Sequence, residues 1–135
     1  MTYTSILSGS AIVLGISFML YVALGKEAGR KGVWLFPAAI SLLFLLYSIQ
    51  TVVVEGPWGF WTQSTGSLWG TQIWTDLLIA IGIGWFFVAP KAKALGMRTV
   101  PWIFVILGTG CIGFLAMVAR VFYLEEKKSL HRATA

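Results

Sequence analysis

Four long runs of apolar residues follow one another along the chain, separated by short polar stretches. They cover about residues 6–24, 33–54, 73–89 and 102–124. A helix needs about 20 apolar residues to cross the hydrocarbon core of a membrane. Only helices and closed barrels satisfy their backbone in lipid, and none of the runs alternates as a barrel strand does. The pattern predicts an all-α integral membrane protein, a four-transmembrane-helix bundle built of two antiparallel hairpins.

Prolines support the ends of these helices. Pro37 falls in the first turns of the second helix, Pro90 is expected to close the third, and Pro101 to open the fourth. The third run is the shortest, and its helix could begin inside the Trp-rich segment before it. The first run could also be a signal peptide cleaved after Ala23. A signal peptide carries positive charge before its apolar core, and no Lys or Arg precedes Lys26, so we expect a retained helix.

Composition agrees with a membrane protein. Hydrophobic residues make up 58% of the chain and charged residues 11%, whereas about a quarter of the residues of a soluble domain are charged. In 135 residues there is room for one bundle with its connections. We therefore expect a single membrane domain over residues 1–135.

The distribution of Lys and Arg predicts an orientation in a bacterial inner membrane. Basic residues are concentrated in the loops 25–32 and 90–101, and neither the N-terminus nor the Trp-rich loop 55–72 contains any. The positive-inside rule places both basic loops in the cytoplasm, with the Trp-rich loop and both termini outside. The C-terminal tail does not fit this orientation, because its basic residues Lys127, Lys128 and Arg132 would then lie outside.

The net charge of +5 reflects topology and contact with lipid headgroups. The chain has no basic patch interleaved with base-stacking aromatic residues, so we expect no nucleic-acid partner. The partners that the sequence favours are membrane lipids, other integral membrane subunits and further copies of the same chain.

The segment "EGPWGFWTQSTGSLWGTQIWTD" concentrates aromatic side chains between two apolar runs. Trp and Tyr gather at membrane interfaces, where one end of the ring is apolar and the other forms hydrogen bonds. An outer aromatic belt is one interpretation, with Trp34 and Trp102 as its cytoplasmic counterparts. In the other, "GPWGFWTQ" forms a short re-entrant or surface-lying helix that covers a lipid, quinone or pigment pocket or docks on another subunit. The belt or docking residues are Trp58, Phe60, Trp61, Trp69 and Trp74.

Two charges fall inside apolar runs, Asp76 in the third and Arg120 in the fourth. In two antiparallel spans they reach a similar depth in the outer leaflet, and charges in membrane helices are usually paired. Gln50, near the end of the second run, belongs to the same layer. In one interpretation Asp76 and Arg120 form a structural salt bridge and the Gln50 amide is hydrogen-bonded. In the other, the three residues form a polar site for an anionic or hydroxylated headgroup.

Small residues recur on one face of the third and fourth runs. Such residues let membrane helices approach closely. Aligned antiparallel, Gly84 meets Gly113 when Asp76 meets Arg120. The predicted packing residues are Ala80, Gly84, Thr109, Gly113 and Ala116.

Residues with catalytic or metal-binding chemistry are scarce. The one His lies in the tail, Cys111 is the one cysteine, and no span contains paired carboxylates. The sequence therefore predicts no metal site, no catalytic residue and no cofactor. A lipid, quinone or carotenoid is the kind of ligand that such a bundle would hold.

The second half of the chain resembles a known family. "WTDLLIAIGIGWFF", "APKAKALGMR" and a last helix ending in "ARVFYLEEKK" are similar to a family of small bacterial membrane proteins of unknown function, mainly over residues 73–128. In that family an Asp-Leu pair opens the third helix and a basic loop leads into the last. The resemblance implies four membrane helices and no assigned chemistry.

Three functions remain open. The sequence favours a small non-catalytic subunit or assembly partner of a larger inner-membrane complex of respiratory or photosynthetic type, because chemistry is scarce and small-residue faces are present. The alternatives are a homo-oligomeric carrier of a small or lipidic solute, and a membrane enzyme on an isoprenoid, carotenoid or lipid substrate with Asp76 as its acid or base.

Overall fold

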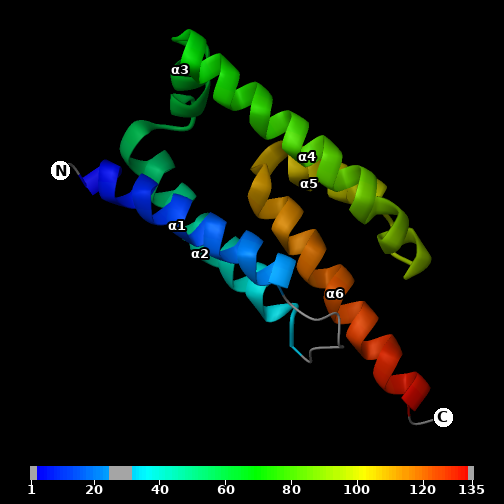
Figure 1. Ribbon diagram of the computed structural model, residues 1–135. Helices are drawn as coiled ribbons and strands as arrows, with labels where there is room; N and C mark the ends of the chain where they lie inside the picture. Colours follow the sequence, from blue (N-terminus) through cyan, green and yellow to red (C-terminus); the bar gives the residue numbers. More distant parts are fainter. Residues whose placement is uncertain (1–2, 25–31, 134–135) are drawn as a thin grey trace.

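The computed structural model describes residues 3–24 and 32–133, in which every regular element is a helix (Figure 1). The prediction of an all-helical chain is confirmed for these residues. The basic loop predicted at 25–32 lies outside the described residues apart from Gly32. The helices are, in chain order, α1 (Tyr3–Leu24), α2 (Leu35–Glu55), α3 (Gly59–Thr65), α4 (Leu68–Ala94), α5 (Val100–Thr109) and α6 (Cys111–Ala133).

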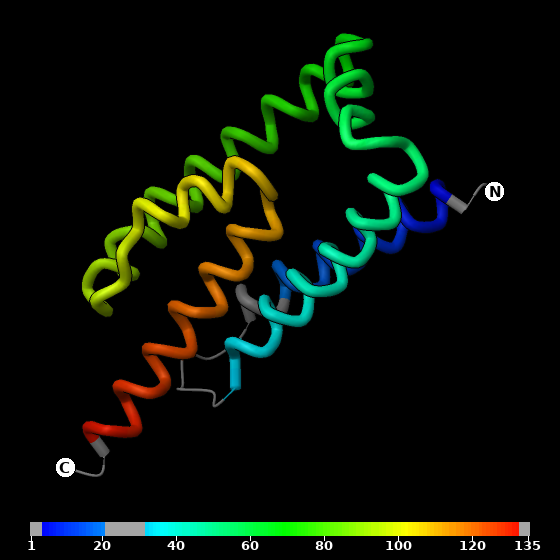
Figure 2. Tube along the Cα trace, turned by 180° about the vertical axis from the view of Figure 1, so that it is seen from behind, coloured from blue at the N-terminus to red at the C-terminus, as the bar shows by residue number. Residues whose placement is uncertain are grey.

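Helix α6 lies in the middle of the molecule, with α2 on one side and α4 and α5 on the other (Figure 1, Figure 2). Two hydrogen bonds show that α2 and α6 run antiparallel. Just before α2, the backbone N–H of Gly32 donates to Glu126 Oε2 at 2.9 Å. Further along, the Ser41 hydroxyl donates to the carbonyl of Ile112 at 2.9 Å.

The buried core lies where α4, α5 and α6 meet. It contains Ala92, Met97, Ile106, Met117 and Val121. Met117 and Ala92 are fully buried, so the tightest packing lies in the half of the molecule away from α3. Helix α1 contacts α2 through stacked rings of Phe18 and Phe36, whose centroids are 5.1 Å apart.

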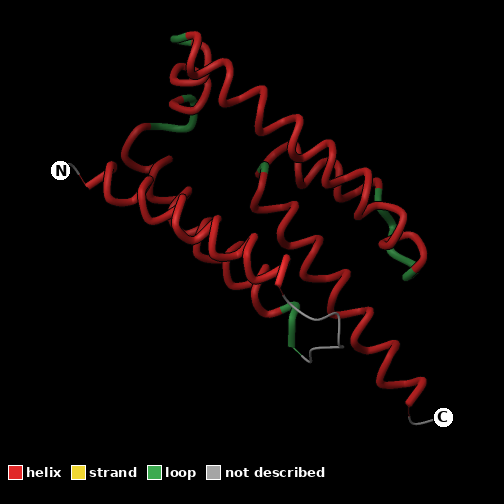
Figure 3. Tube along the Cα trace, viewed as in Figure 1, coloured by secondary structure: helices red, strands yellow, loops and turns green. Residues whose placement is uncertain are grey.

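The predicted continuous helix over 102–124 is wrong. The chain ends α5 at Thr109, reverses at Gly110 and returns as α6 (Figure 3). Gly110 has φ 61° and ψ −129°, a conformation that residues with a Cβ scarcely adopt. As a result α6 runs back along α5, and its C-terminal part lies at the same end of the molecule as the α4–α5 loop (Figure 1). The sequence predicts that these two parts lie at opposite ends.

Helix α4 is longer than the predicted helix over 73–89. It begins at Leu68, inside the Trp-rich segment, where the Ser67 hydroxyl accepts a hydrogen bond from Gly70 N at 3.0 Å. It also continues through Pro90, which therefore does not close it. The Trp-rich segment is not a plain loop, because it also forms α3, a short helix that overlaps "GPWGFWTQ".

Of the helices in the described residues, α2 and α4 are long and apolar enough to cross a membrane. Helix α5, at 10 residues, is a shorter apolar helix, and so is the part Thr4–Leu20 of α1. Helix α5 measures about 15 Å at 1.5 Å per residue, half of the roughly 30 Å that a span requires. A bundle of four full spans is therefore not supported.

Candidate functional site

The loop between α4 and α5 is built by the local sequence "KALGMRTVP". Gly96 adopts φ +79°, and its N–H donates to the carbonyl of Lys93 at 2.9 Å. The N–H of Met97 reaches back to the carbonyl of Ala92, also at 2.9 Å. These two bonds are the pattern of a helix that ends on a left-handed glycine, and they direct the residue after it against the last turn. Met97 is accordingly buried among the core residues.

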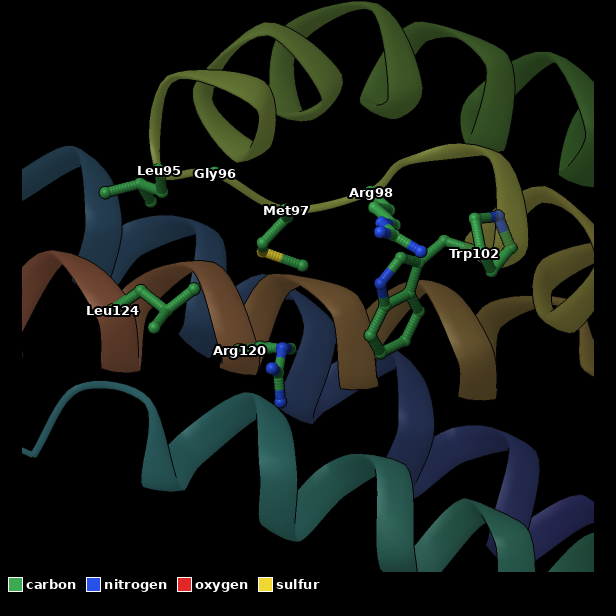
Figure 4. Close-up of a pocket in the computed structure, with 8 residues that line it drawn as sticks. Leu95, Gly96, Met97, Arg98, Trp102, Arg120 and Leu124 are labelled. Atoms are coloured by element: carbon green, nitrogen blue, oxygen red, sulfur yellow. The ribbon is translucent and has the colours of Figure 1, made fainter.

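Beside this loop lies a cavity of about 500 Å³ between the loop, the first turn of α5 and the middle of α6 (Figure 4). Met97 anchors the loop, and Arg98 follows it. The side chains of Met97 and Trp102 reach from the loop and α5 toward α6 (Figure 4). The lining residues are Leu95, Gly96, Met97, Arg98, Pro101, Trp102, Arg120 and Leu124.

Two guanidinium groups border this cavity and no carboxylate does. Arg98 comes from the loop and Arg120 from α6, and in Figure 4 the guanidinium of Arg120 lies on the side of α6 that faces α2. Both side chains are exposed, so each can turn toward a bound group. A guanidinium presents planar N–H donors that match carboxylate or phosphate oxygens. The site is therefore suited to an anion that also carries apolar parts.

The left-handed glycine of the loop gives a testable prediction. We expect Gly96→Ala to lower the free energy of unfolding by about 1 kcal/mol, because an L-residue is strained at φ +79°. Unfolding in mixed micelles with increasing SDS measures the change. Gly82→Ala is the matched control, since Gly82 lies inside α4 with open space around its Cβ position. Equal stability of the two variants would contradict the assigned role of Gly96.

The three residues of the predicted polar site do not come together. Arg120 shares its cavity with Leu95 at the end of α4. Asp76 lies about 28 Å from Leu95 along α4 at 1.5 Å per residue, toward the other end of the molecule. Gln50 and Asp76 are both exposed and neither lines the cavity. The pairing of Asp76 with Arg120 was predicted from a continuous last helix, and the reversal at Gly110 removes it.

The small residues make close approaches, but not with the predicted partners. A Cβ on Gly84 would lie 2.6 Å from Phe114 Cζ, so the ring packs directly on the backbone of α4. A Cβ on Gly113 would lie 2.6 Å from Thr109 Oγ1 and 3.0 Å from Val105 Cγ1. The close packing of α6 on α5 therefore depends on the absence of a side chain at Gly113. Ala80 is exposed and Ala116 is half-buried.

The aromatic residues of the Trp-rich segment gather where α3 meets α4. Phe60 lies 5.9 Å from Trp74 and 6.5 Å from Trp61, measured between ring centroids. Trp58 and Trp69 are 74% and 73% exposed. These rings therefore form a largely exposed apolar surface at the α3 end, far from the cavity.

Sequence reasoning missed the site because it separated its two arginines. In the sequence, Arg98 belongs to the basic loop 90–101 and Trp102 to the cytoplasmic aromatic residues, and neither is linked to Arg120. The signal that was available is "GTGCIG" at 108–113, where glycines and a threonine interrupt an apolar run. Among residues 3–24 and 32–133, no group of three His, Cys, Asp or Glu is placed to hold a metal ion. No protein-family model, curated protein or solved structure matches the chain.

Proposed function

We propose that the chain is a small integral membrane protein in which α1, α2 and α4 cross the bilayer. Apolar exposure supports this proposal. Val53 is 79% exposed, Leu68 is 91% exposed, and few residues of α2 or α4 are buried, unlike the core helices of a soluble protein. Soluble monomers rarely expose contiguous apolar surface of this extent. Lipid or protein must therefore cover these helices.

In this proposal the α5–α6 hairpin enters the bilayer only halfway. The contact of Phe114 with Gly84 sets the tip of the hairpin beside the middle of α4. A turn at that depth requires its polar groups to be satisfied within the protein. Thr109 contributes to this, because its hydroxyl donates to the carbonyl of Val105 at 2.7 Å and accepts from Gly113 N at 3.0 Å.

The half-spanning hairpin also accounts for the basic tail. The described Lys and Arg residues belong to the last turns of α4, the α4–α5 loop and α6 from Arg120 onward, and the α4–α5 loop and the end of α6 lie away from α3 (Figure 1). The positive-inside rule then puts the α4–α5 loop and the tail in the cytoplasm together, with α3 outside. The N-terminus is outside, as the sequence predicts, and the C-terminus is inside.

Labelling of single cysteines tests this orientation. In a Cys111→Ala background, we expect Ser64→Cys in α3 to react with a membrane-impermeant maleimide on intact spheroplasts. Ser129→Cys in the tail should react only after the membrane is permeabilised, because it lies on the cytoplasmic side. Reaction of both residues from the outside would refute the half-spanning hairpin and restore a last helix that crosses completely.

Within the membrane we propose a non-catalytic role, as a subunit or assembly partner of a larger inner-membrane complex. The observation that carries this proposal is the lack of packing around α1. Over residues 4–20, every side chain of α1 except Leu7 is exposed, and Gly9 and Gly15 have no atom near their Cβ positions. Small residues are the usual contact surface between membrane helices. The polar site predicted for a carrier does not form, because Asp76 and Gln50 do not line the cavity that Arg120 borders.

Mild-detergent extraction tests this role. We expect a particle much larger than the 14.8 kDa chain, with other subunits in fixed proportion. Gly15→Leu should release those subunits, because the larger side chain blocks a close helix contact. Gly82→Leu is the matched control, since it adds the same bulk to an exposed glycine on α4. A particle of this chain alone, or equal retention of the other subunits by both variants, would contradict the subunit role.

A further inference from the structure

We propose that the cavity between the α4–α5 loop and α6 binds the phosphate-bearing headgroup of an anionic membrane lipid. This inference rests on the proposed membrane setting and adds a ligand class that the subunit role does not require. In this proposal the headgroup occupies the cavity of about 500 Å³, and the acyl chains lie on the adjoining apolar helix surface.

The charge of the lining selects an anion. Arg98 and Arg120 both border the cavity, and no Asp or Glu is among its lining residues. Arg98 belongs to the loop and Arg120 to α6, and both side chains are exposed, so each can turn to donate N–H bonds to a phosphate held in the cavity. Bidentate guanidinium–phosphate contacts are stronger and more directional than those of an ammonium.

The remaining lining selects an amphiphile over a free ion. Leu95, Pro101 and Leu124 contribute apolar surface, and Trp102 contributes an indole that has an apolar face and one N–H donor. Rings of this kind reside at the depth of lipid headgroups. A small inorganic anion would leave this apolar wall without a partner, whereas the glycerol and first methylenes of a lipid would cover it.

The position of the cavity also suits a headgroup. It lies at the end of α4, next to Lys91 and Lys93 in the last turn of that helix. In the proposed orientation this end meets the cytoplasmic leaflet, where anionic lipids are concentrated. Basic pockets between membrane helices on this side are typical headgroup sites. The walls are held in advance by the buried Met97 and by the hydrogen bonds that end α4.

Native mass spectrometry of the purified full chain tests the proposal. The protein is titrated in neutral detergent with phosphatidylglycerol, with phosphatidylcholine of the same acyl chains, and with inorganic phosphate. We expect preferential binding of phosphatidylglycerol. Arg98→Gln and Arg120→Gln should each weaken that binding about fivefold, which corresponds to on the order of 1 kcal/mol per basic residue at an anionic lipid surface.

Lys93→Gln is the matched control, because it removes a positive charge from the same end of α4 without altering the lining of the cavity. Because Lys93 does not line the cavity, this variant should weaken the binding of phosphatidylglycerol less than either Arg variant does. Equal binding of the two lipids, or unchanged binding by both Arg variants, would overturn the proposal. Displacement of phosphatidylglycerol by equimolar inorganic phosphate would overturn it in favour of a free-anion site.

Alkaline extraction of the same membranes separates this inference from the proposed function. If the chain stays in the membrane pellet while lipid preference is absent, the headgroup site fails and the membrane proposal stands. If the chain is extracted into the supernatant, the membrane proposal itself fails, and the headgroup site fails with it.

Discussion

Replacing Gly110 with alanine should lower the free energy of unfolding by about 1–3 kcal/mol, the range for a residue forced into a glycine-only backbone conformation. The cause is local, because Gly110 has φ 61° and ψ −129° and nothing lies within 4 Å of its Cβ position. The expected loss of stability therefore comes from backbone strain alone and not from a steric clash. SDS-induced unfolding in mixed micelles measures the loss.

Gly108→Ala provides the control for that experiment. Gly108 is two residues away, inside α5, and also has open space around its Cβ position. Alanine is preferred to glycine inside a helix by about 1 kcal/mol, so this variant should be as stable as the unmodified protein or more stable. If Gly110→Ala were also tolerated, the chain would not reverse at Gly110, and a continuous last helix would be favoured again.

Gly113→Ala should destabilise the α5–α6 hairpin by a different route. Its Cβ would lie 2.6 Å from Thr109 Oγ1 and 3.1 Å from the carbonyl carbon of Val105. Overpacking of this kind costs about 1–3 kcal/mol. The displaced Thr109 hydroxyl would also lose its hydrogen bond with Gly113 N, a further loss of about 1 kcal/mol. The same SDS titration measures the combined loss in the free energy of unfolding.

A second substitution separates the two contributions of Gly113. Thr109→Val removes the hydroxyl and keeps the shape of the side chain. If the close approach and the hydrogen bond both matter, the double variant should be less destabilised than the sum of the two single variants, because the residues share one contact. Strict additivity would show that Gly113 and Thr109 act independently, contrary to the geometry at the tip of the hairpin.

The full-length helices could be predicted from the sequence because their signal is spread over many residues. The run over 33–54 nearly coincides with α2, and the run over 6–24 lies within α1. The start of α4 is harder to predict from the sequence. Its first turns contain Trp, Thr and Gln, and the hydrogen bond of the Ser67 cap, not hydropathy, marks where the helix begins.

The reversal at Gly110 could not be read from hydropathy, because apolar residues continue on both sides of it. Glycine and threonine also occur inside membrane helices, where they serve as packing residues. Whether they pack or turn depends on the contact partner: Gly113 approaches Val105 of α5, whereas an antiparallel alignment pairs it with Gly84 of α4. The pairing of Asp76 with Arg120 depended on that alignment, and so did the separation of Arg98 from Arg120.

The packing of α2 on α6 has a consequence for how the protein is made. Ser41 and its partner Ile112 are separated by 71 positions in the chain. At translation rates of about 5–20 residues per second, α2 emerges roughly 4–14 s before the helix it packs against. During that interval α6 cannot yet cover this face of α2. We expect nascent chains that end before α6 to depend most strongly on membrane-insertion factors.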